Sequence, residues 1–377
     1  MQKKLIALAV AGLASSAVFA QQNNVTIYGV IDVGIDVSNN GYGTQFRAQS
    51  GQSAGTRIGF KGEEALGNGL KAVWLLEQGL AIDTAAVTPH GTTATAPGIN
   101  TASAGGVTAA TNGQFFNRQA YGGLAGNWGQ VTIGRQYTPF WYLKTSADAF
   151  NYGLSPTIRN LYAGIPGDAD RLDNSILYIS PNLSGFLFAV GYSTGNENNV
   201  DGPVNGYLDK MGRTWGVLAM YSNSGLWLGA AYHNARAGDF ATEVGKADAW
   251  MLAGSYDFKV AKVYASYGEG KLSALGHDQA KARTWHIAGS MPFGNHKIMA
   301  SYGKLYDRIH DDADFSVYGI GYEYAFSKRT SLYAALGWGD NDDNAAYGLN
   351  TAVNNGLSNT KAGKTVSSFN LGVRHSF

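Results

Sequence analysis

Apolar and polar side chains alternate along several stretches of the chain. From Val25 to Val37 the odd-numbered positions are mostly apolar, while Thr26, Asp32 and Asp36 lie between them. Because successive side chains of a β-strand point to opposite faces, this pattern predicts a strand with one apolar and one polar face. It also places the two carboxylates on the polar face.

The same alternation recurs along the chain. It is found at 186–192, 250–256, 263–267, 285–291, 318–326 and 369–377. Several of these rows end in aromatic residues, which is typical of membrane strands at the two bilayer interfaces. A soluble sheet with one buried face explains the alternation equally well, but it predicts no aromatic bias at the ends. The pattern therefore favours strands that cross a membrane.

Short and long connections alternate between these segments. Most of the short ones carry residues typical of tight turns, and they lie at 67–69, 126–128, 182–185, 222–225, 257–259, 292–296 and 327–329. Long connections are expected at 38–56, 80–114, 137–172, 194–212, 236–246, 268–282, 304–313 and 339–364. Strict alternation means that all long loops leave from one end, as in outer-membrane barrels.

Eight long and seven short connections join about sixteen strands. We therefore expect an all-β fold, a transmembrane antiparallel β-barrel of 16 strands with long external loops. A barrel of ~16 strands encloses an aqueous channel, whereas one of ~8 strands is filled by side chains. Residues 85–112, rich in Ala, Thr and Gly, fall where the second long loop belongs, and we expect them to form an exposed loop.

The N-terminus carries an export signal. Lys3 and Lys4 precede an apolar run over residues 5–18, which is followed by small residues of the type that a signal peptidase reads. The run is shorter than the ~20 apolar residues that a membrane helix needs. We expect residues 1–20 to be a signal peptide and residues 21–377 to form one barrel domain.

Composition and charge exclude several classes of function. Without Lys3 and Lys4 the chain has 26 basic and 27 acidic residues, so its formal charge is −1. This balance lacks the basic excess of nucleic-acid-binding proteins, so we expect no nucleic-acid partner. The chain has no cysteine, which excludes disulfides and thiolate metal sites. We expect neither a cofactor nor a resident metal.

The C-terminus ends an alternating strand. Phe369, Leu371, Val373, His375 and Phe377 share one face. A barrel leaves no sheet edge exposed in lipid, so the last strand must pair with the first. A terminal phenylalanine is compatible with ordinary apolar burial, but in an exported protein we interpret it as an assembly signal.

Six sequence strings carry a specific resemblance to a known family. They are Thr-Arg-Ile-Gly-Phe-Lys-Gly-Glu-Glu (56–64), Leu-Gly-Asn-Gly-Leu-Lys-Ala-Val-Trp (66–74), Asn-Arg-Gln-Ala-Tyr (117–121), Gly-Arg-Gln-Tyr-Thr-Pro (134–139), Tyr-Glu-Tyr-Ala-Phe-Ser-Lys-Arg-Thr (322–330) and Gly-Val-Arg-His-Ser-Phe (372–377). Together they resemble the trimeric general porins of Gram-negative bacteria, in particular the β-proteobacterial branch. The resemblance covers essentially the whole chain after the signal.

The resemblance implies a homotrimer in the cell outer membrane, with the third loop folded into the lumen of each barrel. It implies passive diffusion of ions and small hydrophilic solutes. The implied partners are outer-membrane lipid, lipopolysaccharide and, through the C-terminal strand, the barrel assembly machinery.

In such porins, arginines on the wall face carboxylates on the third loop. Matching motif to motif, the wall arginines are Arg57, Arg135 and Arg171. Arg57 alternates with Ile58 and Phe60, so it points inward, and Arg171 shares its phase with polar positions. Arg135 shares its phase with apolar positions, so it reaches the lumen only if a bulge or a strand end intervenes.

The third loop offers three carboxylates, Asp148, Asp168 and Asp170, accompanied by Lys144 and Arg159. We expect Asp148 to face the wall arginines, and Asp168 and Asp170 to pair near Arg171 at the base of the loop. Each of these charges is equally compatible with an ordinary solvated loop. Leu177 stands where this branch is expected to carry a basic residue.

Two other function classes, an outer-membrane enzyme and a structural anchor or adhesin, remain open. His90, His277 and His310 fall in expected loops, and no signature associates them with a nucleophile. Asp340, Asp342 and Asn344 resemble the start of a calcium loop, but Ala345 and Thr351 replace its glycine and closing glutamate. We expect no catalytic residue. A structural anchor would not need arginines such as Arg57, Arg135 and Arg171 on the barrel wall.

Overall fold

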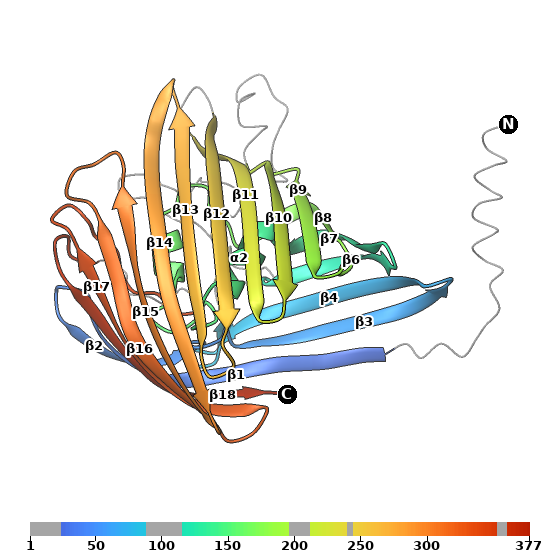
Figure 1. Cartoon of the computed structure of the whole chain (residues 1–377), viewed down its shortest axis with the longest axis horizontal. Helices are drawn as coiled ribbons and strands as arrows, with labels where there is room; N and C mark the ends of the chain where they lie inside the picture. Colours follow the sequence, from blue (N-terminus) through green and yellow to red (C-terminus); the bar gives the residue numbers. More distant parts are fainter. Residues whose placement is uncertain (1–23, 88–114, 196–211, 240–243, 353–359) are drawn as a thin grey trace.

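The computed structural model describes residues 24–87, 115–195, 212–239, 244–352 and 360–377. The expected signal peptide, most of the second and fourth long loops and His90 lie outside the described residues. Figure 1 shows the strands side by side in a curved wall, with helix α2 within its curve.

The described part of the chain forms one antiparallel sheet. Its strands are β1 (Asn24–Asn39), β2 (Thr44–Ser50), β3 (Arg57–Gly67), β4 (Leu70–Ala81), β5 (Ala86–Val87), β6 (Gln119–Gly126), β7 (Gly129–Tyr137), β8 (Arg171–Ile179), β9 (Phe186–Ser193), β10 (Thr214–Asn223), β11 (Leu226–Asp239), β12 (Val244–Asp257), β13 (Lys262–Ala274), β14 (His277–Phe293), β15 (His296–Asp307), β16 (Phe315–Ala325), β17 (Thr330–Asn341) and β18 (Val366–Ser376).

Strand β1 closes the ring. It pairs with β18 from Val30 to Asn39, with β3 over 24–30 and with β2 over 33–39. Strands β2 and β3 therefore follow one another along one edge of β1 and act as a single barrel strand, while β5 is a two-residue extension beside the end of β4. The wall is a closed antiparallel barrel of 16 strands, as the alternation predicts.

The two faces of the wall carry the predicted chemistry. Val25 and Ile27 are about 60% exposed on the outer face, whereas Asp32 and Asp36 are buried on the inner face. Both carboxylates are held across strands. Tyr333 on β17 donates to Asp32 at 2.5 Å, and Ser368 on β18 donates to Asp36 at 2.8 Å.

All seven predicted short turns are present between consecutive strands. Some predicted loops are wrong because the strands continue through them. The segment 268–282 is a hairpin in which β13 reaches Ala274 and β14 starts at His277, and β11 and β12 continue into 236–246. The expected loop at 38–56 contains β2. Beyond the hydrocarbon layer, outward side chains need not be apolar, so polarity there does not end a strand.

Aromatic side chains form a girdle on the outer face, toward the end that carries the long connections. Ring centroids lie between 5.1 and 6.1 Å apart in the pairs Trp215–Tyr232, Trp250–Tyr267, Trp285–Tyr302, Tyr302–Tyr318 and Tyr318–Trp338. This row extends from β10 to β17 and marks one membrane interface. In the described residues no helix is long and apolar enough to span a membrane.

The segment between β7 and β8 packs against the polar face of the sheet. It contains α2 (Pro139–Ser146) and α3 (Arg159–Tyr162). Phe140, Leu143 and Ile165 are fully buried in one apolar cluster with side chains of the wall. Leu177 belongs to the same cluster, so at this position the chain uses an apolar contact beneath α2 rather than a pore charge.

Glycines on the inner face make room for this segment. A Cβ built at Gly270 would lie 2.6 Å from the carbonyl oxygen of Pro166, and one built at Gly268 would lie 2.6 Å from the hydroxyl of Tyr162. Any larger side chain would displace the segment or the wall. The wall is therefore shaped to receive residues 138–170.

Candidate functional site

A polar cavity of about 500 Å³ lies between the segment 138–170 and the wall. Its charged lining comprises five arginines and two carboxylates, which leaves an excess of three positive charges. These residues are Arg57, Glu77, Arg118, Arg159, Asp170, Arg171 and Arg374. The cavity is thus electropositive, although the chain as a whole is nearly neutral.

Glu77 on β4 connects two of the arginines. Its Oε2 lies 3.3 Å from Nε of Arg57, and its Oε1 lies 2.8 Å from Nε of Arg118. Tyr28 on β1 donates a hydrogen bond to Oε2 at 2.8 Å. One carboxylate shared by two guanidinium groups neutralises only part of their charge, so this side of the cavity stays positive.

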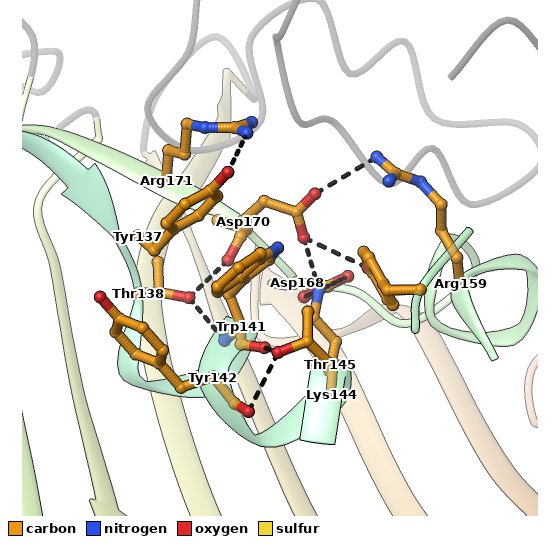
Figure 2. A network of polar contacts seen from close by, with 12 residues as sticks. Tyr137, Thr138, Trp141, Tyr142, Lys144, Thr145, Arg159, Asp168, Asp170 and Arg171 are labelled. Atoms are coloured by element: carbon orange, nitrogen blue, oxygen red, sulfur yellow. Dashed lines mark hydrogen bonds and ion pairs between the residues drawn. The ribbon is translucent and has the colours of Figure 1, made fainter. Parts of the chain in front are cut away.

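Tyr137, the last residue of β7, connects Arg118 to Arg171. Its hydroxyl oxygen accepts from Arg118 at 2.6 Å and from Arg171 at 2.9 Å. The guanidinium of Arg171 also lies 4.5 Å from the centroid of the Tyr137 ring. On the loop, the ring of Trp141 stacks on Tyr137 with centroids 3.5 Å apart (Figure 2). Arg118 and Arg171 are therefore held in place by Tyr137, whose ring is itself packed on Trp141.

Thr138 and Pro139 explain why α2 begins at this stack. The Thr138 hydroxyl accepts from the backbone N–H of Trp141 at 2.9 Å, which is the contact of a helix N-cap. Proline at the first helical position has no N–H to leave unpaired. The same hydroxyl donates to the carbonyl of Ala169 at 2.8 Å, which joins the two ends of the segment.

Arg135 lies beside the cavity rather than in its lining. The sequence predicted that it turns inward only through a bulge, and the pairing of β7 with β8 does shift register between Gly134 and Gln136. Its Nε donates to the carbonyl of Asn117 at 2.7 Å, and its Nη1 lies 2.5 Å from Asp173. Arg135 therefore supports the base of the site.

Lys144 on α2 is completely buried within the segment. Its ammonium lies 2.5 Å from Asp168 and 2.8 Å from Asp170, and Arg159 contacts Asp170 at 3.3 Å (Figure 2). Burial alone would lower the pKa of Lys144, but the two carboxylates raise it above its ordinary value. Burial opposes ionisation of Asp170, yet Lys144 and Arg159 hold its pKa below the usual range. Lys144 thus links α2 to Asp168 and Asp170 at the C-terminal end of the segment.

Asp168 and Asp170 do lie near Arg171, but their direct ion pairs are with Lys144 and Arg159. Burial raises the pKa of Asp168 to about 6, although Lys144 acts in the opposite direction. Only Asp170 of this pair reaches the lining of the cavity. The loop therefore contributes one of its three predicted carboxylates to the cavity lining.

Asp148 does not face the arginines. Its carboxylate accepts from the Thr157 hydroxyl at 2.6 Å and from the backbone N–H groups of Phe150 and Tyr152 at 3.1 and 2.9 Å. Burial raises its pKa to about 6, with these hydrogen bonds opposing the shift. Asp148 instead organises the backbone of the segment.

The sequence interpretation missed Glu77, Arg118, Tyr137 and Arg374 as site residues. Glu77 is a lone carboxylate directly after the apolar run 72–76, which is a usable signal. Arg118 and Arg374 stand inside two of the strings that carried the family resemblance. Arg374 points to the inner face, where it lies 2.5 Å from Glu323 and 3.2 Å from the Ser53 hydroxyl.

Residues 7–344 match the sequence profile described as Gram-negative porin. The chain belongs to this family. Over the full length of both chains, the porin is 31% identical to outer membrane porin protein 32 of Delftia acidovorans. It is 29% identical to major outer membrane protein P.IB of Neisseria meningitidis, over 90% of this chain and 93% of that protein.

Solved structures agree with the fold. The porin superposes on the structure described as an anion-selective porin from Comamonas acidovorans with a TM-score of 0.76, at 24% identity, over 94% of this chain and 100% of the other. A TM-score of 0.63 is found with OmpF of Salmonella typhi, at 16% identity. These comparisons confirm the resemblance to β-proteobacterial porins.

Family membership fixes the location and the general activity. The porin resides in the outer membrane and forms a channel through which small solutes diffuse passively. The related proteins are channels rather than enzymes.

Proposed function

We propose that this porin prefers anions and that the electropositive cavity is the narrow part of its diffusion path. The observation that carries the proposal is the excess of arginine over carboxylate in the cavity lining. Arg57, Arg118 and Arg171 form the wall side, and the segment 138–170 forms the opposite side. In this proposal Arg135, Asp148 and Asp168 support the constriction without lining it.

Coulomb attraction supports an anion preference. One charge ~4 Å from an ion is worth about 1 kcal/mol in bulk water and about 4 kcal/mol near a protein surface. A narrow passage lies between these limits, so an excess of three charges raises the local anion concentration. Arg57, the most exposed arginine of the wall side at 25%, is the one that a passing anion reaches most readily.

The Comamonas structure is described as anion-selective, but at 24% identity it supports the fold alone. The preference proposed for this chain rests on its own arginines. Glu77 and Asp170 keep the cavity from being uniformly positive, and Asp170 lies on the loop side. Opposed charges of this kind create a transverse field in which polar solutes orient.

We further propose that the functional unit is a homotrimer embedded in outer-membrane lipid and lipopolysaccharide. Porins typically form trimers, which supports this assembly. Phe377 at the end of the closing strand would serve the barrel assembly machinery as a recognition signal. No cofactor or catalytic residue is assigned, because diffusion through the channel requires no chemistry from the protein.

The experiment is the zero-current potential of single trimers in a planar bilayer across a tenfold salt gradient. Arg57→Glu should lower anion relative to cation permeability several-fold, because it reverses a charge in the cavity lining. Arg171→Glu should act in the same direction.

Asp342→Asn is the matched control, because Asp342 lies in an exposed outer loop and its charge is screened beyond ~8 Å at physiological salt. If Arg57→Glu leaves the potential of folded trimers unmoved, the cavity is not the constriction. A bilayer that stays silent with folded wild-type protein would favour the enzyme or anchor alternative.

A further inference from the structure

The connection 51–56 between β2 and β3 forms part of the cavity. The cavity lining includes three of its residues, Ser53, Ala54 and Gly55. Nη1 of Arg57 donates to the carbonyl of Gly55 at 2.9 Å, and Nη1 of Arg374 donates to the Ser53 hydroxyl at 3.2 Å. The positions of both guanidinium groups therefore depend on where this connection lies.

The carboxylate of Asp32 on β1 holds the connection. Gly51, at φ +71°, turns the backbone out of β2, and the three following N–H groups converge on Asp32 as in an anion-binding nest. Gln52 donates to Oδ1 at 3.2 Å, while Ser53 and Ala54 donate to Oδ2 at 2.9 and 2.7 Å. Hydrogen bonds to an ionised carboxylate are about twice as strong as neutral ones. Asp32 therefore supplies the acceptors that fix three successive residues of the connection.

Further contacts fix Asp32 itself and the end of the connection. Tyr333 on β17 donates to Oδ1 of Asp32 at 2.5 Å. The Thr56 hydroxyl donates to the backbone carbonyl of Asp32 at 2.8 Å and accepts from its backbone N–H at 3.1 Å. Asp32 and Thr56 are 0% and 1% exposed, so water does not compete for these bonds. A buried donor that loses its acceptor is costly, and the arrangement therefore tolerates little movement.

The ion pairs of the two arginines are with other carboxylates. Arg374 stands directly opposite Asp32 in the ladder between β1 and β18, yet its guanidinium lies 2.5 Å from Glu323. Nε of Arg57 lies 3.3 Å from Glu77. The hydrogen bonds that relate Asp32 to both arginines therefore run through the connection.

The connection also contacts the segment 138–170 on the other side of the cavity. The carbonyl of Gln52 accepts from the backbone N–H of Leu154 at 2.8 Å. A Cβ built at Gly153 would lie 2.0 Å from the carbonyl oxygen of Ser53, so the two backbones are in close contact. A shift of the connection would therefore alter both sides of the cavity.

We propose that Asp32 is a positioning residue for the anion path, which holds Arg57 and Arg374 in the cavity lining through the connection 51–56. The inference rests on the proposed anion preference. Removing a negative charge favours anions by Coulomb attraction. Removing the acceptors of Asp32 has the opposite effect, because each guanidinium is then free to turn fully toward its neighbouring glutamate. The sign of the change in selectivity therefore distinguishes positioning from charge.

The test compares Asp32→Asn with Asp32→Ala, because both remove the same charge. The asparagine oxygen still accepts from Ser53 and Ala54, whereas alanine retains no acceptor. In zero-current potentials of folded trimers, Asp32→Ala should lower the permeability ratio of anions to cations about twofold or more, as expected of groups coupled in one network. Asp32→Asn should give a ratio above that of Asp32→Ala. An equal rise of the ratio in both variants would identify a direct charge effect and overturn the proposal.

Asp36→Asn is the matched control, since Asp36 lies on the same strand and face. Its partners lie outside the cavity lining and are Arg47, Ser368 and Asn370. This variant should keep the wild-type ratio or raise it. A fall would show that the loss of any inward carboxylate has this effect, which would also overturn the proposal.

A double replacement, Arg57→Gln with Arg374→Gln, tests whether Asp32 acts through these two arginines. In that background Asp32→Ala should lower the ratio no further, because the charges that it positions are absent. A further fall of the same size would mean that Asp32 acts elsewhere in the pore.

Heat-modifiable migration reports whether each variant forms folded trimers. If Asp32→Ala forms none, Tyr333→Phe replaces it, because this change keeps the charge of Asp32 and removes one of its donors. Tyr333→Phe should lower the ratio to a smaller extent, and an unchanged ratio would then overturn the proposal.

A crystal structure of the Asp32→Ala trimer, or of Tyr333→Phe in its place, separates this inference from the anion preference. The contact between Arg57 and the Gly55 carbonyl should be absent or partly occupied. If that contact is lost but Arg57→Glu leaves the potential unmoved, the anion preference fails and the positioning role stands. If Arg57→Glu moves the potential and the contact persists, the positioning role alone fails.

Discussion

Asn370 on the closing strand holds Ser155 of the segment 138–170 by two hydrogen bonds. Its Oδ1 accepts from the Ser155 backbone N–H at 3.0 Å and from the Ser155 hydroxyl at 2.8 Å. Its Nδ2 donates to Asp36 on β1 at 3.0 Å. One buried amide therefore joins the first strand, the last strand and the segment that lines the cavity.

Replacing Asn370 with alanine should loosen this segment. The change leaves the Ser155 donors without their acceptor, at about 1–3 kcal/mol for a buried unpaired group. We expect a lower melting temperature and larger fluctuations of the open-channel current. Ser155→Ala should have a smaller effect, and Asn223→Ala in an exposed turn should have none. If current fluctuations in Asn370→Ala equal those of wild type, apolar packing alone holds the segment in place and the hydrogen bonds are not needed.

Gly270→Ala should push the segment away from the wall. The new methyl group would lie 2.6 Å from the carbonyl oxygen of Pro166, a backbone atom that cannot rotate aside. Overpacking of this kind costs about 1–3 kcal/mol. We expect single-channel conductance to fall, because the displaced segment enters the lumen. Gly289→Ala is the matched control, since the nearest atom there is 3.8 Å away, and an equal conductance in both variants would contradict the packing argument.

The pKa of Asp148 makes the segment sensitive to pH. Burial raises this pKa from 3.8 to about 6, so the folded protein holds the proton more tightly than the unfolded chain. The associated stability is fully present below pH ~4 and is lost as pH rises through about 6. A shift of about two units corresponds to about 3 kcal/mol at most.

Hydrogen exchange of residues 148–158, corrected for intrinsic rates, measures this effect. Protection in wild type should fall between pH 4 and 7. Asp148→Asn should give a shallower profile, because asparagine cannot ionise and Asp168 is then the remaining carboxyl of the segment with a pKa raised to about 6. Asp312→Asn, on an exposed loop, should retain the wild-type profile. A wild-type profile in Asp148→Asn would assign the pH dependence to another group.

Deleting Phe377 should reduce the amount of inserted trimer without affecting export. The backbone of Phe377 exchanges two hydrogen bonds of 3.1 Å with Gly29 on β1, while its ring stays 45% exposed. A partly exposed terminal ring is accessible to another protein before insertion. Heat-modifiable migration of membrane fractions measures the trimer, with Ser376→Ala as control. Normal trimer from the deletion would refute the assembly role.

The sequence predicted the wall because lipid imposes a strict code on it. Outward positions such as Val25 and Ile27 must be apolar within the hydrocarbon, and turns need residues such as Asn68 at positive φ. Outside the hydrocarbon layer, outward side chains need not be apolar, so the alternation disappears. That is why the sequence predicts a long loop where the structure has a hairpin around Leu275.

The site was only partly predictable, because inward positions obey no comparable rule. The phase of Arg57 was clear from its strand, and that of Arg135 required a bulge that sequence alone does not show. Glu77 follows a run that is apolar on both faces, so its direction could not be assigned. The sequence places Asp148 opposite the arginines because it does not reveal which backbone N–H groups the loop will bring to a carboxylate.

The position of β1 has a consequence for the unfinished barrel. Until β18 arrives, β1 is an edge strand, and its inward carboxylates Asp32 and Asp36 lack the partners that Tyr333 and Ser368 later supply. Charged residues that point inward from an edge strand oppose pairing with foreign strands. The same two carboxylates would therefore disfavour aggregation of the incomplete sheet in the periplasm. When the ring closes, Tyr333 and Ser368 donate hydrogen bonds to them and the edge no longer exists.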